Sequence, residues 1–116
     1  MNPPDDGKRP AIARIWRGRT PRARADEYAK YLYEVGIRPL EEKALAVMQL
    51  REDREHETKF VTISYWPSVE AMSAFAGPDP RRIHHLPRDP EFLIEVPKSV
   101  QVLDITASKG VFDDSF

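Results

Sequence analysis

Residues 58–77 restrict the possible folds of this chain more than any other stretch. Apolar and polar side chains alternate over residues 58–66, which is typical of a β-strand. Pro67 then stops the strand, and Ser68 offers its hydroxyl as the N-cap of a short helix that we expect to end at Gly77. The stretch therefore predicts a strand that leads directly into a helix.

A longer helix is predicted nearer the N-terminus. Thr20 offers a side-chain N-cap, Pro21 suits the first helical position, and apolar residues recur at helical spacing after them. Gly36 is a natural C-cap, and Pro39 argues against a helix that continues through it. We therefore expect this helix to cover residues 21–35.

The other elements follow from the same two periodicities. Val69, Met72 and Phe75, with Ala76, recur at helical spacing and predict the buried stripe of the short helix. Three further strands are predicted at residues 11–17, 44–52 and 99–106. A charged hairpin loop covers residues 53–57, and a helical turn is expected at residues 90–94. Strand, helix, strand, strand, helix, strand is the split βαβ order of an α+β, ferredoxin-like fold. In that fold a four-stranded antiparallel sheet carries both helices on one face.

The two helices can cover only one face of this sheet. Both faces of two strands carry apolar side chains, with Ile12, Trp16, Phe60 and Trp66 on one face and Ala11, Ala13, Ile15, Val61, Ile63 and Tyr65 on the opposite one. A large apolar sheet face usually has a partner, and we expect a homodimer in which two sheets stack face to face. The alternative is that the Pro-rich segment 78–97 folds back over this face.

Composition sets the broad class of the protein. The chain has 116 residues, which is the size of one domain, and we place that domain at residues 11–106 between a disordered leader (1–10) and a tail (107–116). Eighteen Lys and Arg residues against 19 Asp and Glu residues argue against nucleic-acid binding. There is no cysteine and no stretch as apolar as a membrane span, so we expect a cytoplasmic protein without membrane contact. Three histidines without thiols make a metal site improbable.

Two adjacent histidines are the first candidates for chemistry. His84 and His85 follow the short helix and precede a Pro-rich turn, where the mouth of a cleft is plausible. Because neighbouring side chains point in different directions, we expect only one of them to face a site. An imidazole there could serve as a general base, as a hydrogen-bond donor to an oxyanion or as an axial ligand to haem iron. The alternative is that both are surface residues.

A cleft walled by strands 11–17 and 58–66 and by the short helix would hold a small aromatic or anionic ligand. Arg14 lies in mid-strand among apolar neighbours, so it pairs with a carboxylate such as Asp104 or binds a carboxylate or phenolate ligand. Trp66, at the end of its strand, suits either the core or a pocket wall. The predicted ligand-binding set is Arg14, Trp16, Tyr65, Trp66, Phe75 and His84, with His85 as the catalytic candidate.

The chain also resembles a known family. The segment Ile12–Trp16, followed by a Pro-started helix, and Ser64–Ala71, followed by Phe75, are similar to the antibiotic-biosynthesis-monooxygenase family of dimeric α/β-barrel proteins. The resemblance covers about four-fifths of the chain, from Ala11 to Thr106. It implies a ferredoxin-like homodimer with one cleft per subunit between the helices and the sheet.

The resemblance implies two chemistries. One branch of the family oxygenates aromatic polyketides without a cofactor, using an Asn and a Trp in the cleft. Another binds and degrades haem, with a histidine past the second helix as iron ligand, and His85 falls at that place. The only asparagine of this chain is Asn2, in the predicted leader. Phe75 stands where the haem branch has a tryptophan in the second helix.

If the protein is an enzyme, we expect cofactor-free oxygenation, or a related proton-abstraction step, on an ionised phenol-like ligand. His85 would act as the base, Arg14 would stabilise the anion, and Trp66 and Phe75 would form the apolar wall. The alternatives are a haem protein that uses His85, and a non-catalytic dimeric binding or regulatory module.

Overall fold

The computed structural model describes residues 9–79 and 81–109. The predicted leader (1–10) and tail (107–116) fall outside these residues except for 9–10 and 107–109. The predicted domain, residues 11–106, is described apart from residue 80.

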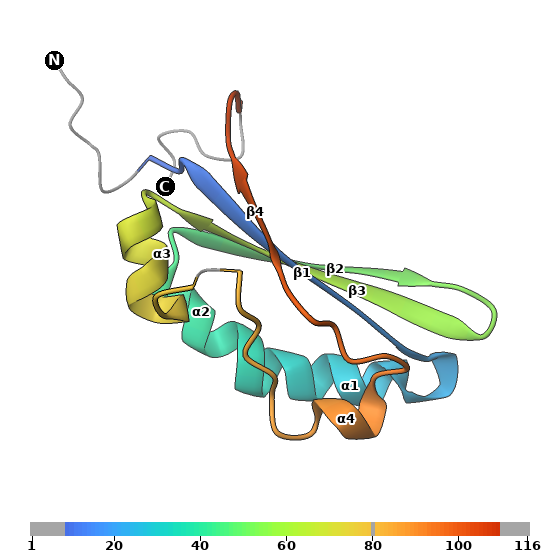
Figure 1. Ribbon diagram of the computed structural model, residues 1–116. Coiled ribbons are helices and arrows are strands. Elements are labelled where there is room, and N and C mark those ends of the chain that lie inside the picture. The colour runs from blue at the N-terminus through green and yellow to red at the C-terminus, as the bar shows by residue number, and fades with distance from the viewer. Residues whose placement is uncertain (1–8, 80, 110–116) are drawn as a thin grey trace, which may run out of the picture.

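The sheet has the predicted four antiparallel strands (Figure 1). They are β1 (Ile12–Pro21), β2 (Ala46–Asp53), β3 (Glu57–Trp66) and β4 (Gln101–Asp104). Their order across the sheet is β2-β3-β1-β4, so the two strands that the helices follow, β1 and β3, lie at its centre. The helices lie together on one face of the sheet, which confirms the ferredoxin-like α+β class.

The first helical region is longer than predicted and begins later. It consists of η2 (Arg22–Arg24), α1 (Ala25–Tyr31), the π-helical η3 (Leu32–Ile37) and α2 (Arg38–Lys43). The predicted end at Gly36 is wrong, and so is the expectation that Pro39 breaks the helix. The Arg38 N–H reaches back five residues to the Tyr33 carbonyl, and Pro39 follows in the first turn of α2, where its missing N–H does little harm.

The predicted N-cap at Thr20 is also wrong. Thr20 and Pro21 are the last residues of β1, where they pair with Thr58 and Glu57 of β3. The β1–β3 ladder continues to this point, and a proline at a strand end sacrifices no ladder hydrogen bond inside the strand. Tertiary pairing has here overridden a sequence pattern that also suits a helix start.

The second helix, α3 (Val69–Ala76), begins and ends as predicted. The Ser68 hydroxyl accepts a hydrogen bond from the Ala71 N–H at 3.0 Å, and Gly77 ends the helix at a φ of 95°. The predicted stripe is correct at Met72 and Ala76, which are buried, and wrong at Val69 and Phe75, which are 44% and 38% exposed. The helix turns the edge formed by Met72 and Ala76 toward the sheet.

Residues 81–100, which we call the strap, connect α3 to the last strand. The strap contains the helix α4 (Asp89–Phe92), close to the predicted turn at 90–94. Phe92 packs between the rings of Tyr28 and Tyr31 on α1, with centroids 5.2 and 5.8 Å away. Figure 1 shows the strap on the helix side of the sheet, so the alternative in which it covers the opposite face is wrong.

Two apolar clusters form the core between sheet and helices. One contains Phe60 at the middle of β3, and its buried members are Ala25, Tyr28, Leu32, Ile37, Phe60, Phe92 and Leu93. The other contains Trp66 at the end of β3, and its buried members are Ile12, Leu40, Trp66 and Met72. Phe60 and Trp66 share one face of β3, as the alternation predicts, and the structure shows that the helices cover this face.

The opposite face of the sheet, which we call the open face, is largely apolar. Strand register places nine apolar side chains together on it: Ala13, Ile15, Ala46, Met48, Leu50, Val61, Ile63, Tyr65 and Leu103. Leu50 and Leu103 are 42% and 45% exposed. No helix among residues 9–79 and 81–109 has the length and apolar character that spanning a bilayer requires.

Candidate functional site

A cavity of about 310 Å³ lies between the covered face of the sheet and the helices. Its wall is mostly apolar and includes residues from both core clusters. Its lining residues come from β1, β3, the first helical region, α3 and the strap: Arg14, Trp16, Leu32, Val35, Gly36, Ile37, Pro39, Leu40, Thr62, Ser64, Phe75, Ile83, His84, Leu86, Asp89 and Val100. A largely apolar pocket with a few polar groups suits a small organic ligand.

Arg14 brings a positive charge to this wall from the middle of β1. Its Nη2 donates a hydrogen bond to the Arg82 carbonyl of the strap at 3.1 Å. The predicted partner, Asp104, lies opposite Ile12 in the strand register, whereas Arg14 lies opposite Val102. Burial lowers the pKa of Arg14, although a guanidinium in a protein stays charged. The site therefore contains a partly desolvated cation.

Trp16 and Phe75 form aromatic parts of the wall. The indole of Trp16 lies across Gly18, two residues along the same face of β1, and a Cβ atom at Gly18 would overlap the ring. The alternation of the strand and the missing side chain at Gly18 together fix the place of the indole. Phe75 projects from α3 and lies against Trp66, with ring centroids 5.5 Å apart.

Only one of the two adjacent histidines lines the cavity, as expected, and it is His84. Its Nε2 lies 2.6 Å from the Ala76 carbonyl, at the end of α3. A carbonyl only accepts, so Nε2 carries the proton in this contact. His85 is exposed and is not among the lining residues.

Tyr65 and Trp66 do not line the cavity. Trp66 is 1% exposed, and its Nε1–H donates to the Ser64 hydroxyl at 2.9 Å, so it packs in the core behind Phe75. Tyr65 lies on the open face, on the other side of the sheet. The structure thus brings together Arg14, Trp16, Phe75 and His84, and places the other three predicted site residues elsewhere.

Asp89 is the lining residue that the sequence did not reveal. It is 2% exposed, its Oδ1 accepts from the Tyr28 hydroxyl at 2.9 Å, and its Oδ2 accepts from the Leu86 N–H at 3.1 Å. Burial raises the pKa of Asp89, and the two hydrogen bonds and His85 oppose that rise. In the sequence, Asp89 before Pro90 indicates only the start of a helix.

The lining residues contain no set of metal ligands. Among the residues that the structure describes, no three His, Asp or Glu side chains gather in a group that could hold a metal ion. The titratable groups of the cavity are Arg14, His84 and Asp89. This combination can bind an anion and move a proton.

Comparison with known proteins supports the fold. No family of known proteins matches the sequence, and no curated protein matches it either. A solved structure from Bacillus cereus, described as a candidate antibiotic biosynthesis monooxygenase, is similar, with a TM-score of 0.58 at 17% sequence identity. The match covers 88% of this chain and 99% of that chain. The predicted resemblance is therefore confirmed as one of fold.

Proposed function

We propose that the cavity binds a small aromatic molecule that carries a phenolate or carboxylate group. The observation that carries this proposal is a largely apolar cavity of about 310 Å³ with the guanidinium of Arg14 in its wall. Trp16 and Phe75 would contact the ring, and Arg14 would contact the anionic oxygen. A guanidinium has five N–H donors, so one group can hold both the Arg82 carbonyl and a ligand.

We further propose cofactor-independent oxygenation of the ionised ligand. Loss of the phenolic proton raises the electron density of the ring and prepares it for reaction with O₂. One oxygen atom would form a carbonyl on a ring carbon and convert the phenol to a quinone. The other would leave as water with the one hydrogen of that carbon and the proton that the phenol had lost. The fold shared with the Bacillus cereus protein, whose description names a monooxygenase, supports this reaction.

Calorimetric titration with 4-nitrophenol tests the binding proposal. We expect saturable binding to the wild type and at least about 10-fold weaker binding to Arg14→Met, because the methionine keeps an apolar stem and loses the charge. Arg38→Met is the matched control, since Arg38 is an exposed residue of α2 outside the cavity lining. Equal affinity in Arg14→Met, or no binding to the wild type, would contradict the proposal; the second result would favour a non-catalytic module.

The haem alternative has less support in these residues. Haem would supply iron-based oxygen chemistry and needs an axial ligand at the cavity. His85 is exposed outside the lining, and the Nε2 of His84 already contacts the Ala76 carbonyl. Because the residues do not fit the group, we derive no step through it.

We also propose that two copies of the chain associate through the open face. Apolar side chains from all four strands share this face, and three of them, Leu50, Leu103 and Ile63, lie on different strands. A second copy is a suitable occupant because a twofold arrangement places the same apolar surface on both sides of the interface. The covered face, with its cavity, would remain within each subunit.

A further inference from the structure

The carboxylate of Asp89 is held in one position by groups from two elements. The Tyr28 hydroxyl on α1 donates to Oδ1, and the Leu86 N–H of the strap donates to Oδ2. The main chain of Asp89 is fixed as well, because its N–H donates to the Leu86 carbonyl at 3.0 Å and its carbonyl accepts from the Leu93 N–H at 2.9 Å. These four contacts fix the carboxylate at the cavity wall.

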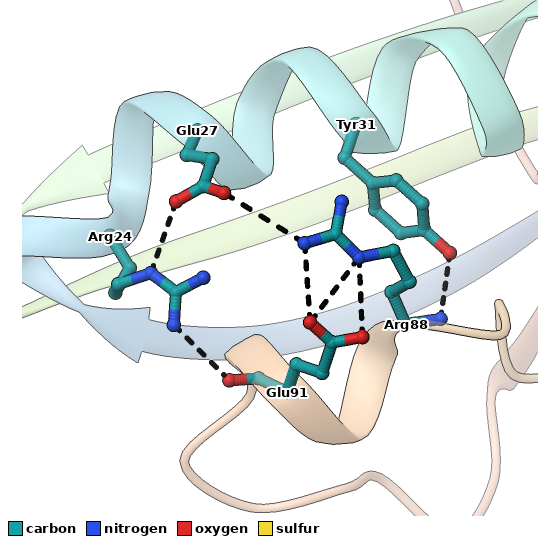
Figure 2. Close-up of polar contacts among 5 residues, drawn as sticks. All are labelled: Arg24, Glu27, Tyr31, Arg88 and Glu91. Carbon is teal, nitrogen blue, oxygen red and sulfur yellow. Dashed lines mark hydrogen bonds and ion pairs between the residues drawn. The ribbon is translucent and has the colours of Figure 1, made fainter.

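The start of α4 is also clamped to α1 from outside (Figure 2). The Arg88 N–H donates to the Tyr31 hydroxyl at 2.8 Å, and the Arg88 guanidinium contacts Glu91 and Glu27 at 3.2 and 3.8 Å. Arg24 contacts Glu27 at 3.1 Å and the Glu91 carbonyl at 3.5 Å. Asp89, the next residue after Arg88, therefore lies in a part of the strap that several contacts connect to the first helical region.

Asp89 retains the capacity to accept a further proton or hydrogen bond. Each carboxylate oxygen has two acceptor positions, and Tyr28 and Leu86 each occupy one. Burial and the neighbouring carboxylate raise the pKa of Tyr28, so its hydroxyl remains a donor. Asp89 is the one carboxylate among the described residues that line the cavity.

We propose that Asp89 accepts the hydroxyl proton of a phenol bound in the cavity. The O–H bond of the phenol breaks, its electron pair stays on the phenolate oxygen, and a new O–H bond forms on Asp89. The net charge of the site does not change, because the negative charge moves from the carboxylate to the ligand, where Arg14 stabilises it. Asp89 thus takes the role of base that was predicted for His85, and this inference rests on the proposed function.

Two properties of the site support this proton transfer. Burial raises the pKa of Asp89, which makes the carboxylate a stronger base than one in water. The charged and titratable groups around it are Tyr28 and Tyr31 on α1, His84, His85 and Arg88 on the strap, and Arg14 across the cavity. Acid that protonates Asp89 in the empty cavity removes its capacity to take the proton of an arriving phenol, so below the pKa of Asp89 formation of the bound phenolate releases that proton to solvent.

The absorbance of bound 4-nitrophenol tests the proposal, because its phenolate and phenol forms have different spectra. At a pH where the free compound is mostly neutral, we expect saturating wild-type protein to raise the phenolate band severalfold. Asp89→Asn cannot take up the proton, so any phenolate that this variant binds must form by release of the proton to solvent, which calorimetry in buffers of different ionisation enthalpy measures. The wild type should release no proton at this pH, and Asp26→Asn is the matched control. Asp26 is a highly exposed carboxylate on α1, with 94% of its side chain accessible, so the phenolate band should be retained in this variant.

The Asp89→Asn variant is expected to fold. The introduced amide has nearly the same shape as the carboxylate it replaces, so the Leu86 N–H can donate to the amide oxygen. The Tyr28 hydroxyl can in turn accept a hydrogen bond from the amide NH₂ group. Circular dichroism and calorimetry report the folding and the affinity of the variant separately from the absorbance.

The outcomes separate the two proposals. If Asp89→Asn forms the bound phenolate without releasing a proton to solvent, the role of Asp89 is overturned and the binding proposal stands. If the wild type does not bind the compound, both fail. Tyr28→Phe gives a second test: it removes a hydrogen bond that lowers the pKa of Asp89, so the pH below which binding releases a proton should rise. An unchanged pH profile in Tyr28→Phe would also contradict the proposed role of Asp89 as the proton acceptor.

Discussion

The two faces of β3 differ in an unexpected way. The covered face carries Thr58, Phe60, Thr62, Ser64 and Trp66, all of them buried. The open face carries aliphatic and aromatic side chains at Val61, Ile63 and Tyr65, all of them partly exposed. The hydroxyl-bearing residues thus point toward the core, and three apolar residues point away from the helices.

The covered face explains where the cavity lies. Phe60 and Trp66 belong to separate apolar clusters, and Thr62 and Ser64 lie between them and line the cavity. Small side chains fill less space than the large rings beside them, so the helices close over a hollow. Both hydroxyls have partners, since Thr62 donates to Gln49 at 2.6 Å and Ser64 accepts from Trp66. One face of this strand therefore lines the cavity, and the other presents apolar side chains on the open face.

Truncation of a ring on the covered face should have the largest effect. We expect Phe60→Ala to lower the free energy of unfolding by about 3–5 kcal/mol, because it removes a fully buried ring that packs against Tyr28 at 5.3 Å. The adjacent Val61→Ala, on the open face, should cost about 1 kcal/mol or less. Urea denaturation at one protein concentration measures both, and equal losses would contradict the distinction between the faces.

A charge on the open face should disrupt association. Ile63→Lys is expected to weaken the proposed dimer about 100-fold, since the twofold arrangement would bring two unpaired cations into an apolar contact. Sedimentation velocity over a range of concentrations measures the dissociation constant. Val69→Lys adds the same charge on α3, at a side chain that is 44% exposed on the helix side, and should leave association unchanged. A wild type that is monomeric at every concentration would contradict the proposed dimer.

Substitution of Gly18 should connect the covered face to ligand binding. In Gly18→Ala the new methyl group would displace the indole of Trp16, and we expect a loss of about 1–3 kcal/mol in stability together with weaker binding of 4-nitrophenol. Gly77→Ala should lose a similar amount through backbone strain, because Gly77 has a φ of 95°. Its affinity should stay near that of the wild type. Calorimetry measures the affinity for 4-nitrophenol and thermal unfolding measures stability, so together they show whether the loss of affinity is specific to Gly18→Ala.

The smallest effects should appear in the pH dependence of stability, and they should have opposite signs for two carboxylates. The pKa of Asp89 is raised by burial, so its stabilising contribution is present below its unfolded pKa and is lost as the pH rises through its folded pKa. The pKa of Asp53 is lowered by hydrogen bonds from Arg51 and Thr58, so its contribution is lost as the pH falls.

Urea denaturation of Asp89→Asn and Asp53→Asn from about pH 3 to pH 7, a range around the ordinary Asp pKa of about 3.9, tests these signs. Relative to the wild type, Asp89→Asn should become less destabilising as the pH rises, and Asp53→Asn more destabilising. The same slope in both variants would contradict the assignment of a buried and an exposed carboxylate.

Most of the fold could be predicted from local signals. Alternation placed β2 and β3 to within a few residues, and the Ser68 cap and the Gly77 end of α3 were correct. The predictions failed where contacts between residues far apart in the sequence determine the local structure. The ladder to β3 draws Thr20 into β1, and the π-helical turn lets the helix pass Pro39. Neither event has a signal within the few residues around it.

The site was predicted only in part. Arg14 and Trp16 could be found because their place in an alternating strand fixes the face on which they lie. The same rule places Tyr65 on the other face, where the structure has it. His84 and His85 could not be separated, because their chain segment has no repeating geometry. Asp89 was missed because its neighbours in sequence indicate only a helix start.

The sequence by itself determined the order of the elements, the faces of the strands and the ends of α3. These follow from hydrogen bonds and periodicities between residues a few positions apart. Only the tertiary structure decided which groups share the cavity. The strap brings Asp89 to Tyr28 across 61 residues, and the Arg82 carbonyl to Arg14 across 68 residues. Such contacts depend on how distant segments pack, which no local pattern of residues specifies.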